Sequence, residues 1–137
     1  MKRDVLKFAL LLTIVSYMLT ACVNGDSTWT GKWQLRKYEY ADGTVVPEDS
    51  VFYNMQKGSF SALCMTHTGS FITFWGRYTL KDDELCITLL PGSSAIPEFK
   101  RFFGWDDNQR TFHVERITSS ALELKYNTAK YVFRKFG

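Results

Sequence analysis

From residue 31 onward, the chain consists of short segments in which apolar and polar side chains alternate. Leu85, Ile87 and Leu89 show the pattern clearly, since one residue of the opposite phase separates each from the next. A period of two places successive side chains on opposite faces of a strand. Most of these segments end in Gly, Pro, Asn, Asp or Ser, and together they predict strands at 33–40, 51–56, 59–67, 71–80, 85–90, 111–118, 121–126 and 130–136.

Short turns connect most of the predicted strands, so that neighbours in the sequence are expected to pair antiparallel. A sheet of this kind becomes stable when it closes on itself, because closure removes the unpaired edges. The pattern therefore predicts an all-β fold, an up-and-down antiparallel β-barrel of about eight to ten strands. In the first strand, Tyr38 is out of phase with Trp33 and Leu35. This switch indicates a β-bulge near Arg36.

The longest connection, residues 91–110, carries one more candidate element. Phe99, Phe102 and Phe103 would share one face of a short helix that begins at a proline and ends before a glycine. Part of the same stretch also alternates between aromatic and polar residues, as a hairpin strand does. The pattern leaves helix and strand open for residues 97–105.

Residues 1–21 follow a different plan, in which a basic start precedes an apolar stretch and then small residues. This order is typical of a secretory signal that is removed from the mature protein. Thr13 and Ser16 interrupt the apolar stretch, which makes it short for a membrane span of ~20 apolar residues. A retained span and secretion without lipid remain as alternatives.

The Leu-Thr-Ala-Cys sequence that ends at Cys22 resembles the lipobox of bacterial lipoproteins. The resemblance implies that the mature protein begins at Cys22, carries lipid there and is anchored to a membrane. Val23 follows instead of an aspartate, which by the same resemblance favours the outer membrane of a cell envelope. The expected organisation is a signal peptide at 1–21, a polar tether at 22–30 and a barrel domain at 31–137.

Charge excludes one class of partner. The chain has 17 basic and 14 acidic side chains, and three of the basic and one of the acidic residues belong to the predicted signal. The remaining domain is nearly neutral and has no cluster of Lys and Arg. Binding to nucleic acid requires such a cluster, so no nucleic-acid partner is expected.

Two cysteines, Cys64 and Cys86, lie in the predicted domain, on the third and fifth strands. Strands separated by one neighbour lie about 9–10 Å apart. A disulfide requires Cα atoms within about 7 Å of each other. The positions therefore favour two free, buried thiols.

The sequence offers no catalytic motif. Cys64 and His67 are spaced like half of a zinc site, with Cys86 and His113 as conceivable partners, but residues three apart on a strand point to opposite faces. The carboxylates at 82–84 and 106–107 stand where turns are expected, and turns favour such residues without a catalytic reason. A nucleophile elbow and a phosphate-binding loop are both missing from the sequence. We therefore expect neither an enzyme, nor a metal, nor a cofactor.

Short motifs along the predicted barrel resemble lipocalins. Gly31-Lys32-Trp33 is similar to the Gly-x-Trp signature that opens the first lipocalin strand. The family also places a basic residue of the last strand over this tryptophan, a role that the resemblance assigns to Arg134 or Lys135. The second lipocalin motif, of the Thr-Asp-Tyr kind, is missing, so the sequence is identified as lipocalin-like. Further matches follow in order: Gly76-x-Tyr78-x-Leu80, Glu84-Leu85-x-Ile87, Phe112-x-Val114, Leu122-x-Leu124 and Tyr131 to Lys135.

Aromatic residues are abundant, with 11 Phe, 7 Tyr and 4 Trp. Several strands carry them on both faces, which predicts an exposed apolar patch or a second layer in addition to a filled interior. Those expected to line the lumen, together with one methionine, are Tyr53, Met55, Phe74, Tyr78, Phe112 and Tyr126. Those in the long connection are expected to form a lid or contact surface, or a plug that closes one barrel end: Phe99, Phe102, Phe103 and Trp105.

Two functions fit these features. The first is a lipid-anchored lipocalin-like barrel that binds a small apolar ligand in its lumen. The alternative is an interaction or inhibitor module with a filled barrel, which binds another envelope macromolecule through its surface or the 91–110 loop.

Overall fold

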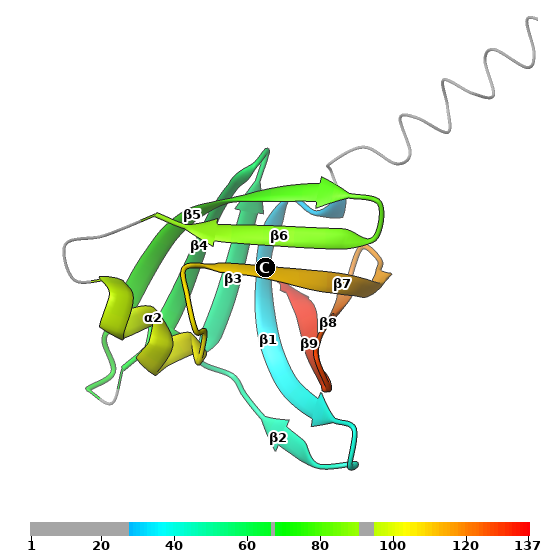
Figure 1. The fold of residues 1–137 in the computed structure, drawn as a ribbon, viewed down its shortest axis with the longest axis horizontal. Coiled ribbons are helices and arrows are strands. Elements are labelled where there is room, and N and C mark those ends of the chain that lie inside the picture. The colour runs from blue at the N-terminus through cyan, green and yellow to red at the C-terminus, as the bar shows by residue number, and fades with distance from the viewer. Residues whose placement is uncertain (1–27, 67, 91–94) are drawn as a thin grey trace, which may run out of the picture.

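Nine strands and one helix make up the part of the chain that the computed structural model describes, which comprises residues 28–66, 68–90 and 95–137. The predicted signal peptide, Cys22, His67 and residues 91–94 of the long connection lie outside it. In chain order the elements are β1 (Gly31–Tyr40), β2 (Val45–Pro47), β3 (Val51–Gln56), β4 (Ser59–Met65), β5 (Phe71–Lys81), β6 (Glu84–Leu89), α2 (Ala95–Phe103), β7 (Gln109–Ile117), β8 (Ala121–Tyr126) and β9 (Ala129–Phe136) (Figure 1).

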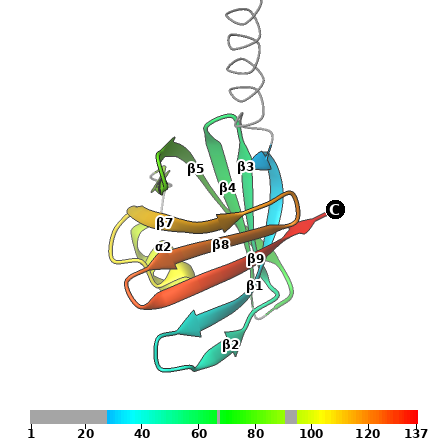
Figure 2. The same cartoon turned by 90° about the vertical axis from the view of Figure 1, so that its right-hand side faces the viewer.

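Eight of these strands close into an up-and-down antiparallel barrel, which confirms the predicted fold. Each strand from β3 to β8 pairs with the next along the chain, and β1 pairs with both β3 and β9. Figure 2 shows the closure, with β7, β8, β9 and β1 side by side. The ninth strand, β2, adds to the free part of β1 through Val45, Val46 and Pro47. It was not predicted, because its three residues, Val-Val-Pro, are too few and show no alternation of apolar and polar side chains.

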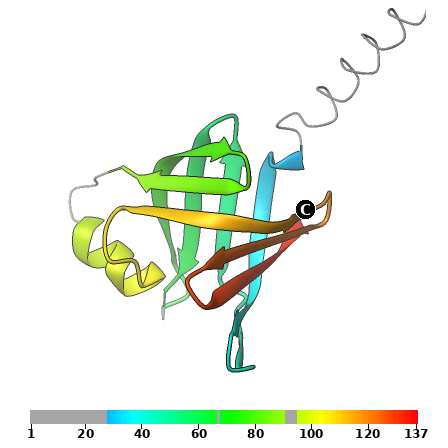
Figure 3. The same cartoon turned by 45° about the vertical axis from the view of Figure 1, so that its right-hand side comes forward.

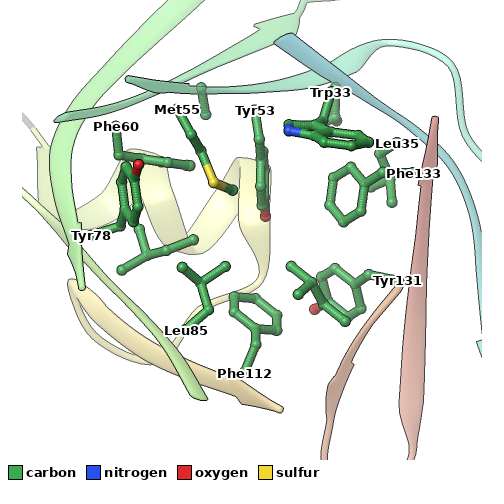
Figure 4. Packing of buried hydrophobic residues seen from close by; sticks show 14 of the residues in the cluster. Trp33, Leu35, Tyr53, Met55, Phe60, Tyr78, Leu85, Phe112, Tyr131 and Phe133 are labelled. Atoms are coloured by element: carbon green, nitrogen blue, oxygen red, sulfur yellow. The ribbon is translucent and has the colours of Figure 1, made fainter. Parts of the chain in front are cut away.

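The period of two in the sequence corresponds to side chains that face the barrel interior and the outside in turn. In β6, Leu85, Ile87 and Leu89 are buried and the residues between them are more exposed. In β8, Leu122 and Leu124 are buried in the same way. The inward side chains of all eight strands form one apolar core, and Figure 4 shows ten of them pointing toward one another across the interior.

Two β-bulges change which residues face inward. The predicted bulge in β1 is confirmed, since its register with β9 shifts between Leu35 and Lys37. As a result Tyr38 packs edge-on against Tyr131, with ring centroids 4.9 Å apart. A second bulge, not predicted, lies in β7 beside Arg116 and turns Ile117 toward the core in its place.

The open choice in the long connection resolves as a helix. α2 begins at Ala95, two residues before the proline expected to start it, and ends at Phe103. The next residue, Gly104, has a positive φ of 68° and donates its N–H to the carbonyl of Lys100 at 3.0 Å. A glycine in this conformation is a common end of a helix. Because antiparallel strands alternate in direction, α2 lies at the barrel end where β1 finishes and β7 begins (Figure 3). We call this the α2 end, and the opposite end, where β1 starts, the Trp33 end.

Candidate functional site

The Trp33 end is closed by side chains whose polar groups are satisfied by the backbone. Trp33 is fully buried and donates its indole N–H to the carbonyl of Trp29 at 3.1 Å. The ammonium of Lys135 lies 4.4 Å from the centre of the Trp33 ring and donates to the carbonyl of Thr30. This cation–π contact is the one that the resemblance assigned to Arg134 or Lys135. Arg134 does not make it, because the period of two in β9 turns its side chain outward.

Gly31 makes room for Lys135. Its φ of +121° is a conformation that other residues rarely adopt, and a Cβ at this position would lie 2.8 Å from the Lys135 Nζ. The glycine and the tryptophan of the predicted signature therefore serve one local structure. Burial lowers the pKa of Lys135.

The residues predicted to line the lumen all face the barrel interior. Tyr53, Met55, Phe74, Tyr78 and Phe112 are buried in the core. The sixth, Tyr126, is partly buried and packs against that core. The structure thus brings together on one inner surface the residues that the alternating pattern assigned to one face.

The aromatic residues of the long connection pack onto the barrel. Phe99 and Trp105 are buried, and Phe102 and Phe103 are half-buried against the core. The ring of Phe103 lies 4.7 Å from that of Phe74, a residue of the inner surface. Of the roles that the sequence left open for these side chains, their positions fit a plug at the α2 end. Figure 4 shows α2 behind the inward side chains.

Arg110 also lies in this region, and the sequence analysis did not identify it. It is only 8% exposed, and its Nη1 donates to the hydroxyl of Tyr131 at 3.0 Å. The guanidinium carbon lies 3.7 Å from the centre of the Tyr126 ring and 5.2 Å from that of Trp105. We call Trp105, Arg110, Tyr126 and Tyr131 the Arg110 cluster. The signal in the sequence was the phase of Arg110, which is two residues before the inward Phe112.

Burial controls the ionisation of the tyrosines near this cluster. Burial raises the pKa of Tyr131, and the neighbouring Arg110 opposes that rise without cancelling it. Burial, reinforced by Tyr131, raises the pKa of Tyr38, and it raises that of Tyr53 well above its usual range. These hydroxyls therefore keep their protons at neutral pH and can donate hydrogen bonds.

Two buried polar atoms have no hydrogen-bond partner within the described part of the chain: the hydroxyl of Tyr78 and the indole N–H of Trp105. Tyr78 is 6% exposed and Trp105 is 1% exposed. A buried donor or acceptor without a partner costs about 1–3 kcal/mol. Both atoms belong to residues that the sequence analysis named, at the lumen and in the long connection.

The two cysteines of the domain are free thiols, as predicted from their strands. Cys64 faces inward, and burial raises its pKa to about 12. Cys86 is only half-buried, which corrects the expectation that both are buried. It lies between Leu85 and Ile87 in phase, so its side chain faces outward, where Gln109 Nε2 donates to its Sγ at 3.0 Å.

Of the carboxylates considered for catalysis, those at 82–83 and 106–107 lie in connections between elements as expected, whereas Glu84 is the first residue of β6, which corrects the expectation of a turn there. Asp82 has a positive φ of 56° between β5 and β6, and Asp107 accepts a hydrogen bond from the backbone N–H of Gln109 at 2.8 Å. Within residues 28–66, 68–90 and 95–137, no three His, Cys, Asp or Glu side chains come together as metal ligands would.

The outer wall carries the exposed apolar residues that aromatic content on both faces predicted. Trp75, on β5, is 65% exposed, and Phe71, Met65 and Leu90 are also exposed. Trp75 and Leu90 border a shallow groove of about 370 Å³ over β3, β4 and β5.

Among the helices that the structure describes, none has the length and apolarity to cross a membrane.

Comparison with known proteins identifies the family. No curated protein matches the sequence significantly. A solved lipocalin-like protein from Bacteroides uniformis has 50% sequence identity and a TM-score of 0.75, with 80% of this chain and 100% of that chain covered. An uncharacterized protein from Bacteroides eggerthii, also at 50% identity, has a TM-score of 0.70 and covers 79% of this chain and 99% of its own. The model of the lipocalin-like domain family matches residues 17–136, and the chain belongs to that family.

Proposed function

We propose that this protein is a lipid-anchored lipoprotein of the cell envelope whose barrel binds a small, mainly apolar ligand. The observation that supports the ligand is a pair of buried polar atoms, Tyr78 Oη and Trp105 Nε1, that have no partner among the described residues and lie in a mainly apolar interior. Buried polar groups in folded proteins are nearly always hydrogen-bonded, so each exception calls for an explanation. A ligand between the strands and α2 would supply the missing partners.

The lining suits such a ligand. Ligand sites are mostly apolar and contain a few placed polar groups that fix orientation. The inner surface here has aromatic walls at Tyr53, Phe74 and Phe112, and Phe103 of α2 lies over them. Entry at the α2 end requires that α2 move away from the rim, whereas entry at the Trp33 end would break the hydrogen bonds of Trp33 and Lys135 to backbone carbonyls.

Native mass spectrometry of residues 28–137 tests the ligand. This domain is similar in extent to the two solved relatives, because about four fifths of this chain aligns with nearly the whole of each of theirs. A ligand barrel is expected to show an additional mass that organic solvent extracts. A clean mass without adduct, together with no binding of added apolar acids or alcohols, would contradict the proposal.

The anchor rests on the resemblance of the sequence around Cys22 to a lipobox. Replacing Cys22 with Ser in the full chain is expected to move the protein from the membrane fraction to the soluble fraction of the envelope. Retention of that variant in the membrane would support an uncleaved N-terminal span instead.

A second function, binding of another envelope protein through the outer wall, is favoured by one observation. Trp75 is the most exposed large apolar side chain among the described residues, and it stands beside the groove over β3 to β5. Exposed apolar patches often mark binding surfaces. Trp75→Ser should then abolish crosslinking to an envelope protein and leave ligand binding unchanged, with Phe71→Ser as a matched change outside the residues that border the groove.

A further inference from the structure

We propose that the Arg110 cluster binds the carboxylate of an amphiphilic acid, whose apolar part enters the barrel. This inference rests on the proposed ligand-binding function and names the chemical class of the ligand. Its first support is a buried charge that has no counter-ion among the ion pairs of the described residues. Arg110 is only 8% exposed, yet the ion pairs among the described residues involve other, more exposed cations.

A buried charge without a counter-ion is costly unless other groups stabilise it. The ring of Tyr126, at 3.7 Å from the guanidinium carbon, stabilises the positive charge through its π face. A ring over the face of a guanidinium does not accept its N–H groups, which lie in the plane. Arg110 has five such donors, and the structure gives one of them an acceptor, the Tyr131 hydroxyl.

The other polar groups of the cluster are donors as well. The indole of Trp105 is donor-only, buried and without a partner in the described part of the chain. The Tyr131 hydroxyl accepts from Arg110 and, because it remains protonated, still has its own O–H to donate. A site of converging donors with one positive charge favours an acceptor that is an anion. A carboxylate fits best, because its two oxygens can accept two parallel N–H groups of one guanidinium.

The apolar part of the ligand is indicated by what lies beneath Arg110. Phe112, the next inward residue of β7, packs against the rings of three members of the cluster: Trp105 at 6.1 Å, Tyr126 at 6.0 Å and Tyr131 at 5.2 Å. Below Phe112 the inner surface continues with Leu85 and Leu124. The cluster is thus a polar rim above an apolar interior, the arrangement that suits an acid at the end of an apolar chain.

The test measures the binding of decanoate and of decanol to residues 28–137 by calorimetry. The two compounds share an apolar chain and differ in charge. Wild-type protein is expected to bind decanoate about 10- to 100-fold more tightly, the factor that hydrogen bonds to a charged group provide. Arg110→Met should abolish this preference and leave decanol binding unchanged. Arg116→Met is the matched control, because it removes an exposed cation from the same strand, and it should keep the preference.

Thermal melting of the unliganded variants separates a binding role from a structural one. Replacing a buried charge by an apolar side chain of similar size often leaves a protein as stable or makes it more stable. Arg110→Met is therefore expected to melt at or above the wild-type temperature. If that variant does not fold, Tyr131→Phe provides a second test, since loss of its hydroxyl should weaken decanoate binding several-fold and leave decanol binding unchanged.

The outcomes distinguish this inference from the function on which it rests. Equal binding of decanoate and decanol by the wild type, or an unchanged preference in Arg110→Met, would overturn the acid site and leave an apolar-ligand barrel intact. Binding of neither compound by the folded wild type would contradict ligand binding itself. A lower melting temperature of Arg110→Met together with an unchanged preference would make Arg110 a structural residue.

Discussion

Each end of the barrel holds a cation beside a tryptophan, and the two pairs differ in what completes their hydrogen bonds. At the Trp33 end, the Trp33 indole donates to the carbonyl of Trp29, and Lys135 donates to that of Thr30. Both acceptors belong to the segment that leads into β1. The arrangement is complete within the chain.

At the α2 end, Arg110 stands beside Trp105 in a similar way, but the chain supplies fewer acceptors. The Trp105 N–H has none among the described residues, and Arg110 donates to a hydroxyl in place of a carbonyl or carboxylate. A cation and a tryptophan are therefore structural where backbone carbonyls accept their hydrogen bonds, and they are a candidate ligand site where the described residues offer no such carbonyl. Four predictions test this difference.

The largest effect is expected from removing the tryptophan of the closed end. Trp33→Ala should lower the free energy of unfolding by about 3–5 kcal/mol, because it leaves a cavity in a fully buried position. Urea denaturation followed by circular dichroism measures the loss. Trp75→Ala, which truncates an exposed tryptophan, is the control and should change stability by less than about 0.5 kcal/mol. Equal stability of the Trp33→Ala variant and the wild type would rule out a structural role for that end.

Alkaline pH should act through the buried tyrosines and through the buried thiol of Cys64, whose pKa burial raises to about 12, so that the contribution of this thiol is lost as the pH rises above about 8.5. Burial raises the pKa of Tyr131, Tyr38 and Tyr53, so the folded state holds protons that the unfolded state releases above about pH 10. Their contribution to stability is complete below pH 10 and is lost as the pH rises above it, by up to about 1.4 kcal/mol per pH unit for each tyrosine. Urea titrations between pH 8 and 12 should show this decline. A smaller decline is expected in Tyr53→Phe, and a flat profile in the wild type would contradict the prediction.

A smaller loss is expected at Gly31. An alanine there would have to adopt a φ of +121° and would displace the Lys135 ammonium from its place over Trp33. We expect a loss of about 1–3 kcal/mol. Gly43→Ala, at a φ of +90° with open space around it, isolates the backbone strain. If both variants lost the same stability, the contact between Lys135 and Trp33 would contribute nothing measurable.

The sequence predicted these two ends unequally. Alternation in the strands was sufficient for the barrel and for the inward position of residues such as Tyr53 and Phe112. The Trp33 end was found through a local motif, although its cation proved to be Lys135, since the inward phase of β9 runs through Tyr131 and Phe133. Both observations depend on residues near one another in sequence or on a strict period.

The Arg110 cluster depends on residues that lie far apart in the sequence. Tyr126 and Tyr131 come from two later strands, and Trp105 is placed by α2, for which the pattern left helix and strand open. An arginine at the start of a strand is usually exposed, and only the closed barrel and the packed helix bury this one. The bulge beside Arg116 was missed although the sequence carries its signal, because two polar residues follow Val114 and put Ile117 out of phase with Phe112.

The smallest effect is also the one that separates the two ends most directly. Replacing each tryptophan by phenylalanine keeps most of the apolar surface and removes the indole N–H together with a small part of the ring system. Trp33→Phe removes a donor and orphans the carbonyl of Trp29, and we expect a loss of about 1 kcal/mol beyond the packing change. Trp105→Phe removes a buried donor that has no acceptor in the described part of the chain, so the unliganded domain should lose less stability, or gain some, because the cost of desolvating that N–H disappears. Melting curves of the two variants with and without decanoate complete the comparison. Decanoate should stabilise Trp33→Phe as much as it stabilises the wild type, and it should stabilise Trp105→Phe less. Only the second variant lacks an N–H from which the carboxylate would accept a hydrogen bond. Equal stabilisation of both variants would exclude the Trp105 N–H from the site.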